Sequence, residues 1–297
     1  MECTLCPRRC RADRSSTIGC CGERAEASVT RAALHFGEEP MISGTRGSGA
    51  VFFSGCSLHC VFCQNRDISG GAERLSARAD AVTVTPQRLR ELYMRLIDAG
   101  AHNINLVTPT HFADVIARSL EPVLPVPVVW NSSGYESTET LRRLEGLVSV
   151  YMPDMKYSSA LLAEEYSHAP DYPAVALGAI REMLRQTGAP QLDSDGMLTR
   201  GTLVRHLVLP SAGKNTRGVI DMLAQLPQDF IFSLMAQYTP IPDIERDFPE
   251  LGRRVTQQEY DRAAEYLELS GIESYYLQGL DSATEEMLPL FDGTGTE

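Results

Sequence analysis

The chain has 297 residues, of which 43% are hydrophobic and 22% charged, and its formal net charge is −12 at pH 7. This length and composition predict a globular protein with one large core, or one core with a small appendage. The negative charge disfavours nucleic acid as a partner, because it repels a phosphate backbone. No apolar run reaches the roughly 18 residues of a membrane span, and residues 1–4 lack the residue order of a signal peptide, so we expect a cytoplasmic protein without a membrane partner.

The cysteines are confined to the first part of the chain. Eight are present, at positions 3, 6, 10, 20, 21, 56, 60 and 63. In a reducing cytoplasm, cysteines spaced two or three residues apart are typical metal ligands, because disulfides are rare there and thiolates bind zinc and iron-sulfur clusters. We therefore expect metal sites and not a disulfide framework.

The first predicted element is a small cysteine-rich, metal-binding segment. Cys3, Cys6 and Cys10 have the spacing Cys-x-x-Cys-x-x-x-Cys, and Cys20 and Cys21 follow after an arginine-containing loop. Four thiolates from this group would close a tetrahedral site, which could hold structural zinc or an auxiliary iron-sulfur cluster. Redox-active or metal-free thiols are the remaining alternative.

From residue 50 onward, short apolar runs alternate with amphipathic segments. Because crossover helices connect parallel neighbours in one sheet, this alternation predicts an α/β fold with parallel strands. About six strand–helix units favour a partial (β/α)6 barrel over a closed barrel of eight. The runs assigned to strands are residues 50–55, 103–107, 126–130, 147–152, 202–209 and 230–235.

Two helices in this region have clear start signals. Thr85 is placed as a cap before a helix that begins with Pro86. Thr256 and Glu259 form a capping box for a second helix, and a strand-like run follows it at residues 272–278.

A second cysteine group directly follows the first of these strands. Cys56, Cys60 and Cys63 form a Cys-x-x-x-Cys-x-x-Cys motif. Three thiolates can hold three irons of a [4Fe-4S] cluster and leave the fourth iron open to another ligand. Two alternatives remain open, namely a zinc site with His59 as the fourth ligand and a non-catalytic electron-transfer cluster.

Polar and turn-rich segments complete the pattern. The acidic pair Glu38 and Glu39 could serve a substrate, but we expect it in a solvated turn, since charged side chains are rarely buried without partners. We assign loops to residues 66–82, 189–200 and 240–254.

The chain is thus divided into three parts. We predict a cysteine-rich segment at residues 1–48, a partial barrel at residues 49–280, and an acidic tail at residues 281–297 that we expect to be mobile. Loops at the C-terminal ends of the barrel strands are where an active site would form.

The cysteine triplet, with Phe62 before its last cysteine and five further strand–helix units after it, resembles the radical S-adenosylmethionine (SAM) superfamily. Its flanking residues look like the pyruvate formate-lyase activating enzyme-like branch. This resemblance implies an oxidoreductase that cleaves SAM reductively to a 5′-deoxyadenosyl radical, which abstracts hydrogen from a substrate. It also implies reduced flavodoxin or ferredoxin as electron donor, and a glycyl-radical enzyme as a candidate substrate. Modification of a small molecule or peptide is the alternative within the class.

The resemblance extends to the ends of later strands. Asn131-Ser132-Ser133-Gly134 and Met152-Pro153-Asp154-Met155-Lys156 match motifs of glycyl-radical activating enzymes, and Arg205 lies in a strand similar to one that approaches the cofactor. We expect His206, its neighbour, to be structural. By this resemblance, Cys56, Cys60 and Cys63 hold the catalytic cluster, and the residues that bind the cofactor are Phe62, Thr108, Asn131, Ser132, Asp154, Lys156, Arg205 and Gln237. Without the resemblance, Asp154 and Lys156 would be assigned as exposed loop charges.

The sequence departs from the family at three places. The usual Gly-Gly-Glu-Pro after the second strand is replaced by Thr108-Pro109-Thr110-His111, Asn131 stands in place of an aspartate, and Gln237 lies where activases carry a histidine. These changes affect substrate identity more than cofactor binding. In sequences that the N-terminus resembles, the last ligand stands in a Gly-x-Cys-Gly setting, which implies Cys21 as ligand and Cys20 as bystander.

Overall fold

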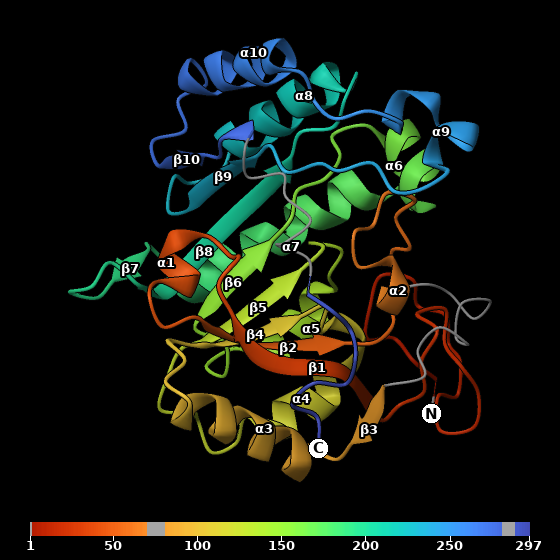
Figure 1. Cartoon of the computed structure of the whole chain (residues 1–297), viewed down its shortest axis with the longest axis vertical. Coiled ribbons are helices and arrows are strands. Elements are labelled where there is room, and N and C mark those ends of the chain that lie inside the picture. Colours follow the sequence, from red (N-terminus) through yellow and green to blue (C-terminus); the bar gives the residue numbers. More distant parts are fainter. Residues whose placement is uncertain (1, 70–80, 281–288) are drawn as a thin grey trace.

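One mixed sheet runs through the computed structural model, which describes residues 2–69, 81–280 and 289–297 (Figure 1). The order of its strands is β10-β9-β8-β6-β5-β4-β2-β1-β3, with β7 paired only to β8. The strands are β1 (Ala27–His35), β2 (Ser48–Phe53), β3 (Val82–Val84), β4 (Ile104–Val107), β5 (Val128–Ser132), β6 (Val150–Pro153), β7 (Gln191–Leu192), β8 (Leu198–Leu207), β9 (Ile231–Met235) and β10 (Tyr275–Leu277).

The parallel part of the sheet follows chain order. Strands β2, β4, β5, β6, β8, β9 and β10 pair in parallel with their neighbours, so all six strands predicted from apolar runs are confirmed and the run at 272–278 adds a seventh. Successive side chains alternate between the two faces of a strand. Trp130 and Tyr151 therefore pack toward the outer helices, whereas Val129 and Val150 face the interior of the partial barrel.

Helices follow most of the parallel strands and cover the outer face of the sheet (Figure 1). Both predicted helix starts are confirmed, because Thr85 accepts a hydrogen bond from the backbone of Arg88 and Thr256 forms a capping box with Glu259. The helices are α1 (Pro40–Ser43), α2 (Arg66–Ser69), α3 (Pro86–Asp98), α4 (Ala113–Ser119), α5 (Thr138–Arg143), α6 (Ala160–Ser167), α7 (Tyr172–Thr187), α8 (Gly213–Ala224), α9 (Ile244–Asp247) and α10 (Gln257–Glu268), with 3-10 turns at Thr110–Phe112 and Pro249–Leu251.

Besides the short β7, two antiparallel strands were not expected from the sequence. β1 pairs antiparallel with β2 and also with β3, so the sheet begins at Ala27, inside the stretch assigned to the cysteine-rich segment. β1 contains mostly small side chains between polar ones, and it therefore lacks the apolar run that marks the parallel strands. The boundary expected between residues 48 and 49 is crossed by this pairing.

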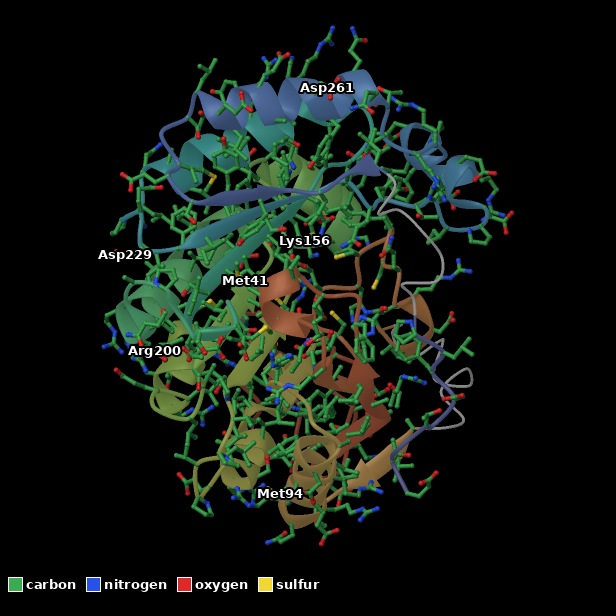
Figure 2. The ribbon with its side chains drawn as sticks, turned by 60° about the vertical axis from the view of Figure 1, so that its left-hand side comes forward. Met41, Met94, Lys156, Arg200, Asp229 and Asp261 are labelled. Carbon is green, nitrogen blue, oxygen red and sulfur yellow. The ribbon has the colours of Figure 1, made fainter. Side chains whose placement is uncertain are left out.

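The short helix α1 lies against the interior face of the sheet. Its Met41 and Ile42 are buried with Val129, Val150 and Leu203, and Figure 2 shows Met41 and Lys156 near the centre of the molecule. Burial of these apolar side chains draws the preceding residues inward. The predicted solvated turn is therefore wrong, because Glu38 and Glu39 lie in the interior.

The three predicted loops contain short elements. α2 lies at the start of 66–82, of which residues 70–80 fall outside the described residues; β7 lies within 189–200; and α9 and a 3-10 turn lie within 240–254. Within the described ranges, no helix is long and apolar enough to cross a membrane.

The end of the chain lies beside β1. Gly293 donates a backbone hydrogen bond of 3.1 Å to Thr30, and Ala32 donates one of 3.0 Å to Thr294. Residues 289–297 therefore continue the sheet edge beyond β3. Residues 281–288 of the predicted acidic tail lie outside the described residues, and mobility of the tail stays a prediction.

Candidate active site

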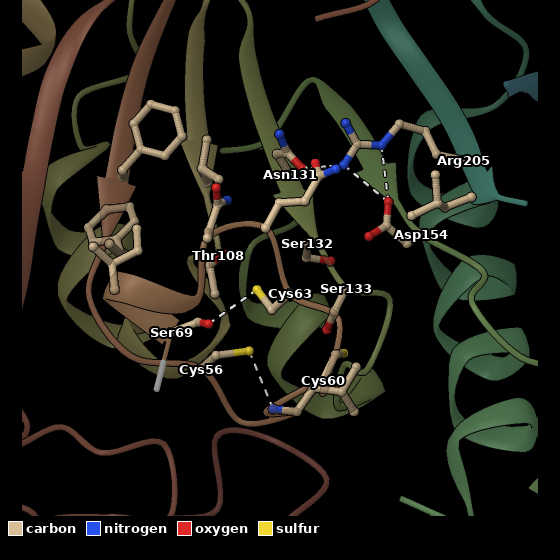
Figure 3. A pocket seen from close by; sticks show the side chains of 18 of the residues that line it. Cys56, Cys60, Cys63, Ser69, Thr108, Asn131, Ser132, Ser133, Asp154 and Arg205 are labelled. Carbon is tan, nitrogen blue, oxygen red and sulfur yellow. Dashed lines mark hydrogen bonds and ion pairs between the residues drawn. The ribbon is translucent and has the colours of Figure 1, made fainter. Parts of the chain in front are cut away.

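The three cysteines of the second motif lie on the loop after β2, at the C-terminal ends of the parallel strands (Figure 3). We name residues 55–63 the cluster loop. The loop begins at Gly55, whose φ of +84° favours glycine, and a Cβ there would lie 2.5 Å from the Glu23 side chain and 2.7 Å from the Cys21 carbonyl oxygen. Close packing thus fixes the direction in which the loop leaves the strand.

Each thiol of the cluster loop has a polar neighbour. Ser167 and Ser69 donate hydrogen bonds of 3.1 Å to Cys60 and Cys63, and the N–H of Leu58 donates one of 3.4 Å to Cys56. Burial raises the pKa of Cys63 to about 12 and also raises the pKa of Cys60. Metal binding at these positions would therefore release protons, since the thiolate is the ligand.

The arrangement of the possible ligands bears on which metal the cluster loop could hold. Among the described residues, no group of three or more His, Cys, Asp or Glu side chains is arranged to hold one metal ion. A cubane takes one thiolate per iron, so its three ligands need not converge on one atom. His59 is turned away from the thiols, because its ring nitrogens lie 2.7 Å from the Cys20 carbonyl oxygen and 3.2 Å from that of Ser69. The alternative in which His59 completes a zinc site is not supported by these contacts.

The residues predicted to bind the cofactor come from several strands and line one cavity with the three cysteines. They converge because the carboxyl ends of parallel strands meet at one edge of the sheet. The cavity-lining residues from the sequence prediction are Cys56, Cys60, Phe62, Cys63, Thr108, Asn131, Ser132, Asp154, Lys156, Arg205 and Gln237.

An ion-pair network occupies the wall of this cavity opposite the cluster loop. The Arg205 guanidinium donates to Asp154 Oδ1 at 3.1 Å and to Asn131 Oδ1 at 2.7 Å (Figure 3). Lys156 Nζ lies 2.6 Å from Asp154 Oδ2. Burial alone would raise the pKa of Asp154, but Lys156 and Arg205 lower it below its usual value. Burial would lower the pKa of Lys156, whereas Asp154 and the nearby Cys60 raise it. Both cations therefore stay charged.

A second acidic group, which the sequence predicted in a solvated turn, belongs to this network. Glu38 Oε2 lies 3.1 Å from Arg205, and its Oε1 accepts hydrogen bonds from Asn105 at 2.9 Å and Asn131 at 3.0 Å. Glu39 is buried 3.9 Å from Arg205, and burial raises its pKa. The one sequence feature that could have indicated their burial is the apolar Pro-Met-Ile run that directly follows the two acids. Their approach to β5 and β8 depends on how α1 packs.

The altered motif after β4 is divided between two environments. Thr108 lines the cavity, whereas Thr110 donates a hydrogen bond of 2.6 Å to Glu136, which also accepts one of 3.1 Å from Trp130. Burial raises the pKa of Glu136 to about 7. Glu136 is buried and is not among the residues that line the cavity.

Two side chains predicted to be near the site have structural surroundings. His206 is buried, with its ring nitrogens 2.7 Å from the Met155 carbonyl oxygen and 3.0 Å from Thr216, and burial lowers its pKa to about 4. This confirms its structural role. Phe62 lines the cavity but packs edge-on against Tyr157, Tyr166 and Tyr238, so it anchors the cluster loop on the core.

The N-terminal cysteines gather beside the cluster loop. Cys6 and Cys21 are buried, and burial raises their pKa values to about 12 and about 11, while Cys20 is exposed. Cys10 and Cys20 share a side-chain hydrogen bond, and Cys21 lies near Cys3. The selection of Cys21 over Cys20 as ligand and the second metal itself stay predictions.

No protein-family model matches the chain. An uncharacterized protein of Methanocaldococcus jannaschii is 27% identical over 279 residues, which cover 93% of this chain and 77% of that protein. A solved structure of a spore photoproduct lyase variant has a TM-score of 0.50 at 13% identity, with 76% of this chain and 75% of that chain covered. The chain therefore shares its fold with this lyase.

Two further solved structures are similar at lower TM-scores. SuiB of Streptococcus suis bound to precursor peptide SuiA has a TM-score of 0.47 and 11% identity, covering 78% of this chain and 49% of that chain. A domain of the pyruvate-formate lyase-activating enzyme of Bacteroides vulgatus has a TM-score of 0.38 and 16% identity, covering 65% of this chain and 91% of that chain. The predicted α/β partial-barrel fold is confirmed by the strand order of the sheet and by the likeness to the spore photoproduct lyase structure.

Proposed function

We propose that the protein is a radical SAM enzyme that uses a [4Fe-4S] cluster held by Cys56, Cys60 and Cys63. The observation that carries this proposal is the convergence of the cluster loop and polar side chains from β4, β5, β6, β8 and β9 on one cavity. When bound, the cluster supplies reductive cleavage of SAM to methionine and a 5′-deoxyadenosyl radical. Three thiolates leave one iron without a protein ligand, which is the site that SAM requires.

The side chains around the cavity match the charges of SAM. Lys156 and Arg205 are the cations available to its carboxylate, because charge-assisted hydrogen bonds to a carboxylate are strong in a partly desolvated site. Glu38 and Asp154 are the anions available to its amino and sulfonium groups. Thr108 offers a hydroxyl acceptor in place of the carboxylate that relatives carry after β4.

Lys156 has a second role in this proposal. Its positive charge lowers the pKa of Cys60 and Cys63, against the larger effect of burial that raises both. A fixed cation beside the thiols favours the thiolate form that binds iron. The hydrogen bond between Lys156 and Asp154 holds the ammonium group at this position.

The substrate and donor are proposed on the resemblance to activating enzymes. The Met-x-Asp-x-Lys sequence after β6 supports a glycyl-radical enzyme as substrate and reduced flavodoxin or ferredoxin as donor. The second metal at the N-terminal cysteines, zinc or a further cluster, is part of the same proposal.

Anaerobic reduction in the presence of SAM tests this function. Purified protein reconstituted with iron and sulfide should bind four irons at the cluster loop. It should release 5′-deoxyadenosine and methionine once SAM and dithionite are added. A non-catalytic electron-transfer protein would take up iron and yield no 5′-deoxyadenosine. A zinc protein would contain zinc and no acid-labile sulfide. Either result would overturn the proposal.

A further inference from the structure

Arg8, in the N-terminal cysteine segment, reaches two separate parts of the site. Its Nε donates a hydrogen bond of 2.8 Å to the carbonyl oxygen of Ser57, between the first two cysteines of the cluster loop. Its Nη2 donates one of 2.8 Å to the carbonyl oxygen of Ser167, and its Nη1 donates to that of His168. The guanidinium also lies 5.4 Å from the centre of the Tyr135 ring. One side chain therefore joins the cluster loop to the end of α6.

The carbonyl groups that Arg8 binds explain why an arginine stands there. Ser167 is the last residue of α6 and His168 is its C-cap in the left-handed conformation, so their carbonyl oxygens have no partner within the helix. A guanidinium presents five N–H donors in a planar fork, which can serve three carbonyl groups at once. A lysine ammonium has three donors on one nitrogen and cannot span the same acceptors.

The end of α6 is itself in contact with the thiols. The Ser167 hydroxyl donates to Cys60 Sγ at 3.1 Å, and the backbone N–H of Val61 donates to the Tyr166 carbonyl oxygen at 2.9 Å. Movement of this helix end relative to the cluster loop would change the surroundings of Cys60. Arg8 binds the helix end and the loop together.

Two further contacts connect the N-terminal segment with the cluster loop. The N–H of Cys56 donates a hydrogen bond of 3.1 Å to the Cys21 carbonyl oxygen, and the His59 ring lies 2.7 Å from the Cys20 carbonyl oxygen. With Arg8, the segment thus contacts the loop at residues 56, 57 and 59. These contacts involve backbone carbonyl groups and not thiols, so they are compatible with metal binding at either cysteine group.

We propose that Arg8 is a positioning residue that fixes the cluster loop against α6 and so sets the geometry in which Cys56 and Cys60 hold iron. This proposal rests on the proposed function, because it assigns the iron to the cluster loop. The neighbouring Arg9 is exposed and provides a matched control, since it shares the segment and the charge.

The test compares Arg8→Ala, Arg8→Lys and Arg9→Ala as full-length proteins, purified and reconstituted without oxygen. Loss of iron to a chelator should be about tenfold faster for both Arg8 variants, the change expected from losing one charge-assisted hydrogen bond. The electron paramagnetic resonance spectrum of the reduced cluster should also shift and respond less to added SAM. Arg9→Ala should match the parent in both measurements.

The outcomes separate the two proposals. A parent protein that binds no cluster would contradict the proposed function itself. Arg8 variants with parent-like spectra and chelation rates within twofold of the parent would overturn the positioning role, even if their thermal stability without metal is lower, because that result describes a structural contact only. Recovery of the parent spectrum by Arg8→Lys would also overturn it, since the argument depends on the guanidinium fork.

Discussion

The carbonyl oxygen of Cys21 accepts a hydrogen bond of 3.1 Å from the backbone N–H of Cys56. The two cysteine groups, 35 positions apart between these residues, are therefore adjacent in space. We therefore expect the two proposed metal sites to influence each other, because a loss of order in the N-terminal segment would reach the cluster loop through this contact.

Substitution of Cys6 tests this relationship. Cys6→Ala should remove metal from the N-terminal site and leave iron in the cluster loop, since the contacts to that loop are made by backbone groups and Arg8. The remaining iron should be lost to a chelator severalfold faster than in the parent protein. Metal analysis before and after chelation measures both effects. Simultaneous emptying of both sites in a soluble, folded variant would contradict the existence of two sites.

Removal of a thiol from the cluster loop should have a larger effect. Cys56→Ala, Cys60→Ala and Cys63→Ala should each abolish formation of 5′-deoxyadenosine, because two thiolates hold a cubane poorly against oxygen and chelators. Iron content and 5′-deoxyadenosine are measured on anaerobic protein. Retained SAM cleavage in any of the three variants would refute the assignment of these ligands.

The chain has a matched pair of lysines for testing the carboxylate site. Lys156 lies in the cavity beside Asp154, whereas Lys214, the other lysine of the chain, is exposed on α8. Lys156→Ala should weaken SAM binding by at least about tenfold, the value of one charge-assisted hydrogen bond, and Lys214→Ala should have an effect within about twofold. Anaerobic titration calorimetry measures both. Equal SAM affinities for the two variants would show that Lys156 only forms an ion pair with Asp154 and does not bind SAM.

Substitution of Arg205 should affect the stability of the fold as well as SAM binding. Arg205→Ala removes the cation that faces Glu38, Glu39 and Asp154. Glu38 and Glu39 would lose this counter-charge, and Asp154 would keep only Lys156. We expect loss of SAM affinity of at least about tenfold together with a lower melting temperature of the metal-free protein. A variant that keeps both properties would show that the network has no part in the site.

The buried carboxyl of Glu136 predicts a pH dependence of stability. Because burial raises its pKa from 4.5 to about 7, the folded protein binds more protons than the unfolded chain between these values, and stability falls as pH rises through this window. Glu136→Gln keeps an oxygen acceptor for Thr110 and Trp130 and cannot ionise. It should be more stable than the parent at pH 8, by up to about 3 kcal/mol, and lose that advantage at pH 4.5. Urea unfolding at both pH values measures the difference in unfolding free energy between the variant and the parent protein.

The end of the chain forms part of the cavity wall. Pro289 lines the cavity, and the ring centres of Phe291 and Phe52 lie 5.5 Å apart. A Cβ on Gly295 would lie 2.0 Å from the Ala32 carbonyl oxygen. Gly295→Ala should therefore release residues 289–297 from β1. Limited proteolysis of this end should become faster, and SAM affinity should fall severalfold.

A second glycine separates this clash from backbone strain. Gly146 also has a positive φ, of +84°, but a Cβ there would meet no atom within 4 Å. Gly146→Ala should leave both the proteolysis of the C-terminal end and the SAM affinity unchanged. If the two alanine variants have the same SAM affinity and the same rate of proteolysis, the packing of residues 289–297 against β1 does not affect SAM binding.

The sequence by itself determined the parallel sheet and the location of the cavity. Apolar runs report burial on both faces of a strand, and the carboxyl ends of parallel strands meet at one edge, so Asn131, Asp154 and Arg205 could be assigned to one place. The cluster motif was equally visible, because its three ligands lie within eight residues of one loop.

Only the tertiary structure decided which other groups complete the site. Glu38 enters the cavity because Met41 and Ile42 pack into the barrel interior, and Arg8 reaches Ser57 and Ser167 across 49 and 159 positions of sequence. Such contacts leave no periodic pattern, since they depend on which distant surfaces pack together and not on local burial. A charged side chain in a polar segment looks the same in sequence whether it faces solvent or caps the end of a helix.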